Sequence, residues 1–155
     1  MSDDNENLNA QLLAKAERYC AMGEQCAHAV CEKLRTWGAD EAQVCGIIAR
    51  LEEVGFLDEH RYVRIYCNSK VKLQKWGRRK IAFQLRRNHL SEALISEGMA
   101  TVSDEDYFDV LRSVAASKWR TYSSGDDYKN RAKLTAYLLS RGFEMDEIQQ
   151  VIKEL

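Results

Sequence analysis

Proline is absent from this chain of 155 residues, and its eight glycines are scattered singly along the sequence. Without proline, only glycines and polar gaps can interrupt a helix. No glycine-rich stretch matches a loop that binds phosphates or dinucleotides, and the sequence holds neither a Gly-x-Ser-x-Gly turn nor a His-Glu-x-x-His pair. These absences disfavour the common nucleotide-binding and hydrolytic classes, so we expect a protein that is not an enzyme and takes no cofactor.

Long apolar runs and a regular cysteine framework are absent as well. No run approaches the roughly 18 apolar residues that a membrane helix needs, and the first residues are acidic and polar. The five cysteines occur at irregular spacing, so we expect reduced thiols rather than disulfides. A cytoplasmic protein with no membrane partner is therefore predicted. With 45% hydrophobic and 30% charged residues, the composition suits one globular unit of ordinary size.

Hydrophobic residues recur at helical spacing along almost the whole chain. Two sets of four fall at i, i+3, i+4 and i+7: Val44, Ile47, Ile48 and Leu51, and then Ile148, Val151, Ile152 and Leu155. Alternating patterns typical of strands are absent at useful length. Breaks fall near seven glycines: Gly23, Gly38, Gly55, Gly77, Gly98, Gly125 and Gly142. The sequence therefore predicts an all-α fold of about nine short helices.

One hydrophobic pattern is repeated three times. Leu34, Leu85 and Leu138 hold one position of the pattern, at offsets of 51 and 53 residues. Three further positions align in the same register: Val30 with Ile81 and Leu134, Val44 with Ile95 and Ile148, and Gly38 with His89 and Gly142. Chance alignment of amphipathic helices is the alternative, but one register shared by three units favours a true repeat.

The repeat predicts how the chain is organised. Three tandem three-helix repeats, similar to helix-turn-helix units, are expected at residues 8–56, 57–103 and 104–155. Each repeat buries little apolar surface alone, so neighbours are expected to pack together into an elongated, curved array. Residues 1–7 are predicted to form a disordered tail, and Ser123, Ser124 and Gly125 a loop inside the third repeat.

Charge is distributed unevenly, although the formal net charge is only −1. The thirty residues from Arg61 to Leu90 contain ten arginines and lysines and no acidic residue, whereas the rest of the chain holds 13 basic and all 24 acidic residues. A merely solvated helix face normally mixes both signs of charge. Because local charge attracts charged partners more than the total does, the block predicts a surface that contacts acidic protein groups or phosphates.

Helical geometry divides this basic block into faces. On a helix over residues 61–76, five side chains gather in one arc that is expected to be core: Tyr62, Ile65, Tyr66, Leu73 and Trp76. On the next helix, Ile81 and Leu85 are expected to face inward, with Phe83 on the far side among arginines and lysines. The candidate contact surface has ten residues: Arg61, Arg64, Lys72, Lys75, Arg78, Arg79, Lys80, Phe83, Arg86 and Arg87.

Phe83 has two interpretations at this point. If it is exposed, the ring can anchor a protein interface or stack on a nucleotide base while neighbouring guanidinium groups pair with carboxylates or phosphates. If it is buried, it packs against a neighbouring repeat. The sequence leaves both interpretations open.

Other chemistry-bearing side chains favour structural interpretations. Cys26, His28 and Cys31 invite a metal site, but the two cysteines would lie about 140° apart on a helix and no second ligand pair follows. We therefore expect structural cysteines and no bound metal. The three tryptophans come near helix ends, where a large ring usually seals a junction between helices: Trp37, Trp76 and Trp119.

Residues 54–85 read VGFLDEHRYVRIYCNSKVKLQKWGRRKIAFQL. This stretch strongly resembles the RecX family of regulators of the RecA recombinase. One set of residues resembles the family's Leu-Gly-Tyr-Leu-Asp-Asp-x-Arg-Phe stretch: Gly55, Phe56, Leu57, Asp58, Glu59, Arg61 and Tyr62. A second set resembles its Gly-x-Arg-Lys-Ile-x-x-x-Leu stretch: Gly77, Arg79, Lys80, Ile81 and Leu85. The chain departs from the family pattern at Arg78, where proline is common, and at His89, where glycine is frequent.

The resemblance implies an all-helical protein of three tandem three-helix repeats, which agrees with the internal repeat. It also implies a function in DNA repair, homologous recombination and the SOS response. RecX-like proteins bind the RecA filament on single-stranded DNA along its groove, and they restrain its ATPase, its strand exchange and its stimulation of repressor cleavage. The implied partners are the RecA filament and single-stranded DNA, contacted directly or through RecA, and we expect a monomer.

A stand-alone DNA-binding regulator is the alternative hypothesis. Short three-helix units resemble helix-turn-helix folds, and the basic block suits DNA phosphates. Such a regulator would need residues that read bases in the major groove, and it would act without RecA.

Overall fold

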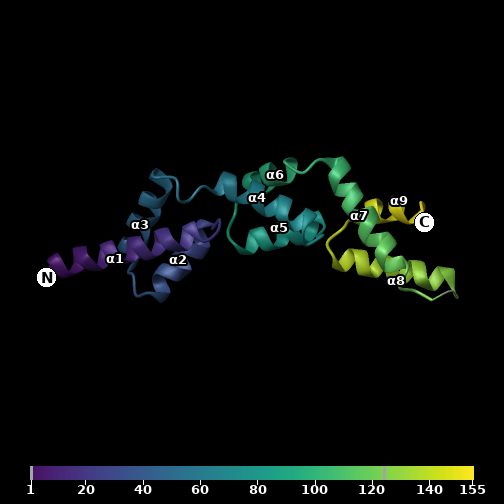
Figure 1. The fold of residues 1–155 in the computed structure, drawn as a ribbon, viewed down its shortest axis with the longest axis horizontal. Coiled ribbons are helices and arrows are strands. Elements are labelled where there is room, and N and C mark those ends of the chain that lie inside the picture. Colours follow the sequence, from purple (N-terminus) through teal and green to yellow (C-terminus); the bar gives the residue numbers. More distant parts are fainter. Residues whose placement is uncertain (1, 124) are drawn as a thin grey trace. The chain divides into compact units, whose positions relative to one another are not determined.

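Nine α-helices and no strands make up the part of the chain that the structure, a computed structural model, describes: residues 2–123 and 125–155 (Figure 1). The predictions of an all-α fold and of about nine helices are confirmed. The helices are α1 (Ser2–Ala21), α2 (Ala27–Thr36), α3 (Glu41–Glu53), α4 (Glu59–Lys72), α5 (Arg78–Arg87), α6 (Glu92–Ala100), α7 (Asp104–Trp119), α8 (Asp127–Ser140) and α9 (Met145–Ile152). Within this described part, no helix is both long and apolar enough to span a membrane.

Contacts divide the chain into two compact units. The first holds the residues up to Tyr62 together with Asn88–Leu90, and the second holds Val63–Arg87 and Ser91–Leu155. The predicted repeat boundaries near residues 56 and 103 fall in the connections α3–α4 and α6–α7. The division into repeats at residues 8–56, 57–103 and 104–155 stays a prediction.

The first unit closes around a hydrophobic core to which α1, α2 and α3 contribute. Eight of its side chains are almost completely buried: Leu12, Ala16, Val30, Leu34, Val44, Ile47, Leu51 and Leu57. A reciprocal cap starts α3, because the Asp40 carboxylate accepts from the Gln43 backbone N–H at 2.8 Å and the Gln43 side chain accepts from the Asp40 N–H at 2.9 Å. This cap fixes the point at which the chain turns back after α2.

The start of the chain differs from the predicted disordered tail over residues 1–7. Helix α1 already begins at Ser2, while residue 1 lies outside the described residues. Asp3 and Asp4 lie in the first turn, where negative charge favours the helix N-terminus. The Asn5 side-chain oxygen accepts a hydrogen bond from the Gln43 amide at 3.4 Å, which joins this first part of α1 to α3.

Residues at equivalent positions of the predicted repeat share features at the helix ends and in the core. Leu34, Leu85 and Leu138 are each 0% exposed. Helices α2, α5 and α8 each end two residues before a residue in the left-handed region: Gly38 (φ 92°), His89 (φ 63°) and Gly142 (φ 98°). Such a residue reverses the chain and closes a helix C-terminus, and glycine adopts it without strain. His89 takes this conformation at the position where the other two repeats have glycine.

The core face of α4 differs from the predicted arc of Tyr62, Ile65, Tyr66, Leu73 and Trp76. Tyr62 is buried and Tyr66 and Trp76 are half-buried, but Ile65 is 42% and Leu73 is 75% exposed. The buried stripe in the second unit is instead formed by Val63, Cys67 and Val71. Gly98 of α6 permits this, since a Cβ there would lie 2.8 Å from the Val63 Cβ and 2.9 Å from the Cys67 sulfur. The close approach of α6 therefore selects the face that is buried.

The cysteines and the loop in the third repeat agree with the sequence analysis where the structure describes them. All five cysteines are free thiols, and burial raises the pKa of Cys67 to about 11. Among the described residues, no group of three or more His, Cys, Asp and Glu side chains is arranged to hold a metal ion. Ser123 and Gly125 lie between α7 and α8, and Ser124 lies outside the described residues.

Candidate partner-binding surface

Helix α5 has one buried and one exposed face. Ile81 and Leu85 are each 0% exposed and belong to the core, as predicted. Phe83 is 56% exposed, and Arg79 and Arg87 are exposed on the same helix. Phe83 is thus exposed in the second unit, which favours the first of the two interpretations of this ring.

The arginines of α5 differ in how far their charges are compensated. The Arg87 guanidinium lies 6.0 Å from the centre of the Phe83 ring, within reach of a cation–π contact. Arg86 instead makes a two-pronged ion pair with Glu92, with Nε 2.5 Å from Oε1 and the second contact at 3.1 Å. This pairing lowers the pKa of the Glu92 carboxyl and raises that of the Arg86 guanidinium. Arg86 is therefore held at the surface and faces a carboxylate already.

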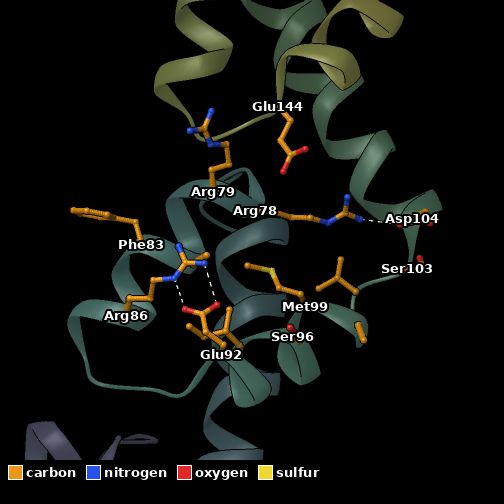
Figure 2. Close-up of a pocket in the computed structure, with 14 residues that line it drawn as sticks. Arg78, Arg79, Phe83, Arg86, Glu92, Ser96, Met99, Ser103, Asp104 and Glu144 are labelled. Atoms are coloured by element: carbon orange, nitrogen blue, oxygen red, sulfur yellow. Dashed lines mark hydrogen bonds and ion pairs between the residues drawn. The ribbon is translucent and has the colours of Figure 1, made fainter.

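A cavity of about 880 Å³ opens beside α5 in the second unit. Figure 2 shows two ion pairs that flank it, Arg86–Glu92 from α5 and α6 and Arg78–Asp104 from α5 and α7. Apolar side chains line the space between the pairs: Ala82, Ile95, Met99 and Val102. Phe83 projects from α5 on the side away from Arg78 (Figure 2). The arrangement presents an aromatic ring and a partly apolar hollow between charged groups.

Arg78 has a structural role within the second unit. Its backbone N–H donates to the Tyr107 hydroxyl at 3.0 Å, and its guanidinium lies 3.8 Å from the centre of the same ring. The guanidinium also pairs with Asp104 at 2.8 Å and with Glu147 at 3.1 Å. Burial raises the pKa of both Tyr107 and Glu147. These contacts join α5 to α7 and α9, so the side chain is not free to meet a partner.

Two further predicted surface residues have acidic partners outside the basic block. The Arg61 Nε lies 2.6 Å from a Glu24 carboxylate oxygen, and its guanidinium donates to the Gly55 carbonyl at 3.1 Å. Both side chains are half-buried and belong to the first unit. Lys72 lies 3.7 Å from Asp106, with both side chains half exposed. Arg61 thus stabilises the fold, while Lys72 keeps a partly compensated charge.

The remaining basic residues of the candidate surface form no ion pair within the described part of the chain. They are Arg64, Lys75, Arg79, Lys80 and Arg87, and all belong to the second unit. Lys80 is half-buried, with its ammonium 4.5 Å from the centre of the Trp76 ring. Arg61 belongs to the first unit, so the structure places nine of the ten predicted residues in one unit.

Several residues at this surface were not found from the sequence. Glu92, Asp104 and Glu147 supply the charges that compensate Arg86 and Arg78. Asp104 and Glu147 are 26 and 69 residues from Arg78, so no local pattern reveals these pairs. Glu92 is six residues from Arg86, across a turn whose geometry the sequence did not specify. The tryptophans behave partly as predicted: Trp37 packs edge-on against Tyr19 at 6.4 Å and Trp119 against Tyr122 at 6.2 Å.

These features define an all-α protein of three-helix units in which one helix presents an aromatic ring among arginines. Comparison with known families adds a specific match. The family model for the second three-helix domain of RecX matches residues 58–99, and that for the third matches residues 104–152. The chain belongs to the RecX family, and the resemblance inferred from its sequence is confirmed.

Individual relatives agree with this assignment. The regulatory protein RecX of Clostridium acetobutylicum is 32% identical over 127 residues, which cover 79% of this chain and 58% of the relative. The chain thus spans little more than half the length of its clostridial relatives. The regulatory protein RecX of Chlorobium phaeobacteroides is 25% identical over 154 residues, which cover 99% of this chain and 96% of the relative. A crystal structure of RecX from Lactobacillus salivarius has the same fold, with a TM-score of 0.87 at 19% identity over 97% of both chains.

Proposed function

We propose that this chain is a regulatory protein that binds the RecA filament on single-stranded DNA and restrains its ATPase, strand exchange and stimulation of repressor cleavage. Membership of the RecX family and relatives named regulatory proteins support a regulator rather than an enzyme. Its place of action would be the cytoplasm, in DNA repair and the SOS response. What this regulator changes is the dynamics of the filament.

The observation that carries the proposal is Phe83, 56% exposed on the same helix face as two arginines without an acidic partner in the described residues, Arg79 and Arg87. Exposed aromatic rings flanked by arginine are typical of side chains that dominate protein interfaces. A guanidinium pairs equally well with protein carboxylates and with phosphates. Together they favour α5 as the helix that docks on the filament.

Two modes of action fit this surface. A bound chain that bridges neighbouring subunits would oppose the rearrangements that accompany ATP turnover. A chain bound at an end would block the addition of subunits. Both modes predict slower ATP hydrolysis by RecA on single-stranded DNA.

The test measures that hydrolysis with and without this protein. The purified chain should hydrolyse no nucleotide itself and should slow the RecA rate, and Phe83→Ala should relieve the inhibition while leaving the helical circular dichroism unchanged. Leu73→Ala is a matched control, because Leu73 is another exposed apolar side chain of the second unit. An unchanged RecA rate at excess protein contradicts the proposal. Sequence-specific binding to duplex DNA without RecA would instead support the stand-alone regulator.

A further inference from the structure

A small pocket of about 280 Å³ in the second unit is lined by Val114 and otherwise by cations and hydroxyl groups, with no acidic residue. We propose that it binds a backbone phosphate of single-stranded nucleic acid. The polar lining residues are Lys75, Lys118, Arg141, Ser117, Thr121 and Tyr137. They come from the α4–α5 connection, from the end of α7 and its connection to α8, and from the end of α8. None of them belongs to the exposed face of α5.

Two of the three cations are held in place by contacts within the second unit. The Arg141 guanidinium donates to the carbonyl oxygens of Gln74 and, at 3.1 Å, of Lys75. Its Nε is buried and has no hydrogen-bond partner in the described structure. A buried donor without an acceptor is costly, so such groups are rare in folded proteins. The Lys118 ammonium lies 4.6 Å from the centre of the Tyr137 ring, which positions a second positive charge.

The walls of the pocket are joined backbone to backbone. The Gly77 N–H donates to the Arg141 carbonyl at 2.8 Å, and the Arg79 N–H donates to the Gly142 carbonyl at 3.0 Å. A Cβ on Gly77 would lie 2.2 Å from the Gly142 carbonyl carbon, so there is no space between the two segments. The backbone segments that carry Lys75 and Arg141 are therefore held against each other.

The charge of the pocket selects an anion. Lys75, Lys118 and Arg141 form no ion pair among the described residues, so three positive charges converge without compensation. Lysine and arginine bind phosphate by charge-assisted hydrogen bonds, and hydroxyl groups add neutral donors. A phosphodiester satisfies both kinds of donor.

The aromatic side chain next along the chain favours single-stranded nucleic acid as the source of the phosphate. Trp76 follows Lys75, is half-buried, and has the ammonium groups of Lys70 and Lys80 at 4.6 and 4.5 Å from its ring centre. Lys70 also lies 5.3 Å from the centre of the Tyr66 ring. Aromatic rings interleaved with cations bind single strands, because bases stack on the rings and cations meet the backbone. A free phosphate ion has no base that could stack on such a ring.

The binding test uses a short fluorescein-labelled oligothymidylate and the full chain without any recombinase, so it can fail without affecting the function proposed above. Fluorescence polarisation is recorded over a range of salt concentrations. The double variant Lys75→Gln with Lys118→Gln should bind more weakly. It should also flatten the dependence of log affinity on log salt by about 1.4, since each lost single-strand phosphate contact accounts for about 0.7.

The matched control removes the same charge elsewhere in the unit. Lys129 and Lys133 are exposed on α8 and do not line the pocket, so Lys129→Gln with Lys133→Gln should keep the parental slope. If the pocket double variant and this control double variant have the same affinity and slope, the proposal is overturned. Circular dichroism confirms that both variants are folded.

Two further arms identify the source of the phosphate. Trp76→Leu should weaken oligothymidylate binding roughly 5- to 150-fold, the range expected for one stacked base. Unchanged affinity would overturn the stacking role. Calorimetric titration with inorganic phosphate forms the other arm: if the pocket variant loses phosphate binding but binds the oligonucleotide like the parent, the pocket serves a free anion and the nucleic-acid assignment is wrong.

Discussion

Arg78 contacts Tyr107 twice: its backbone N–H donates to the tyrosine hydroxyl at 3.0 Å, and its guanidinium covers the same ring at 3.8 Å. The guanidinium also reaches Glu147, whose side chain is 9% exposed. A basic residue that sequence analysis placed on a contact surface is thus built into the joint of α5, α7 and α9.

The first prediction tests this joint. Arg78→Met should destabilise the fold by about 2–3 kcal/mol, because it leaves the Glu147 carboxylate buried without its charged partner. Arg86→Met is the matched control on the same helix, since its ion pair with Glu92 is exposed, and it should leave stability essentially unchanged. Denaturant unfolding compares the two. Equal losses for both variants would contradict the structural role of Arg78.

The second prediction concerns pH. Burial raises the pKa of Glu147 in the folded state, so the folded protein holds the proton more tightly than the unfolded chain does. Stability from this group should therefore fall as pH rises from the ordinary glutamate pKa through the raised value. Glu147→Gln does not titrate, and its side-chain oxygen can still accept from the Glu144 N–H. As pH rises across that window, the unfolding free energy of this variant should increase relative to that of the parent. Plots of unfolding free energy against pH that run parallel for the two proteins would contradict the prediction.

The third prediction concerns the repeat register. Leu34→Ala, Leu85→Ala and Leu138→Ala should each cost about 2–5 kcal/mol, because each removes a fully buried side chain and leaves a cavity. Leu73→Ala is the control, with a 75% exposed side chain and an expected change below about 0.5 kcal/mol. Denaturant unfolding measures all four. A core leucine that behaves like Leu73 would show that the register is wrong in that repeat.

The fourth prediction separates partner contact from folding on α5. Arg79→Glu combined with Arg87→Glu should leave the thermal unfolding midpoint nearly unchanged, because exposed charges contribute little to stability. Inhibition of RecA should be lost, because reversed charges repel a complementary surface. Arg86 is left intact, since a carboxylate there would face Glu92. The corresponding reversal of Lys129 and Lys133 on α8 is the control, and a folded Arg79/Arg87 variant that inhibits like the parent would disprove the role of this face.

Much of the fold follows from local sequence signals. Helical spacing of apolar residues and the residues that end helices are local properties, so nine helices and the shared register of Leu34, Leu85 and Leu138 could be predicted. The buried face of α4 could not be predicted from such local signals. Ile65 and Leu73 are as apolar as Val63 and Val71, and the approach of Gly98 from α6 decides between them. That contact depends on tertiary structure and leaves no mark within the α4 sequence.

The candidate surface shows the same limit for charge. The acid-free block from Arg61 to Leu90 correctly located the basic helices, and the exposure of Phe83 and Arg79 agrees with it. Arg61, however, is paired with Glu24, which is 37 residues away. Counting charges along the sequence cannot distinguish a cation that pairs with a distant acid of the same chain from one that is available to bind another molecule.

The contact between Gly77 and Gly142 has a consequence for how the gene can change. A side chain cannot be added at either position without moving neighbouring atoms, because a Cβ on Gly77 would lie 2.2 Å from the Gly142 carbonyl carbon and one on Gly142 would lie 2.5 Å from the Lys80 Cβ. Two codons that are 65 positions apart are therefore each restricted to glycine by the close approach of the same two backbone segments.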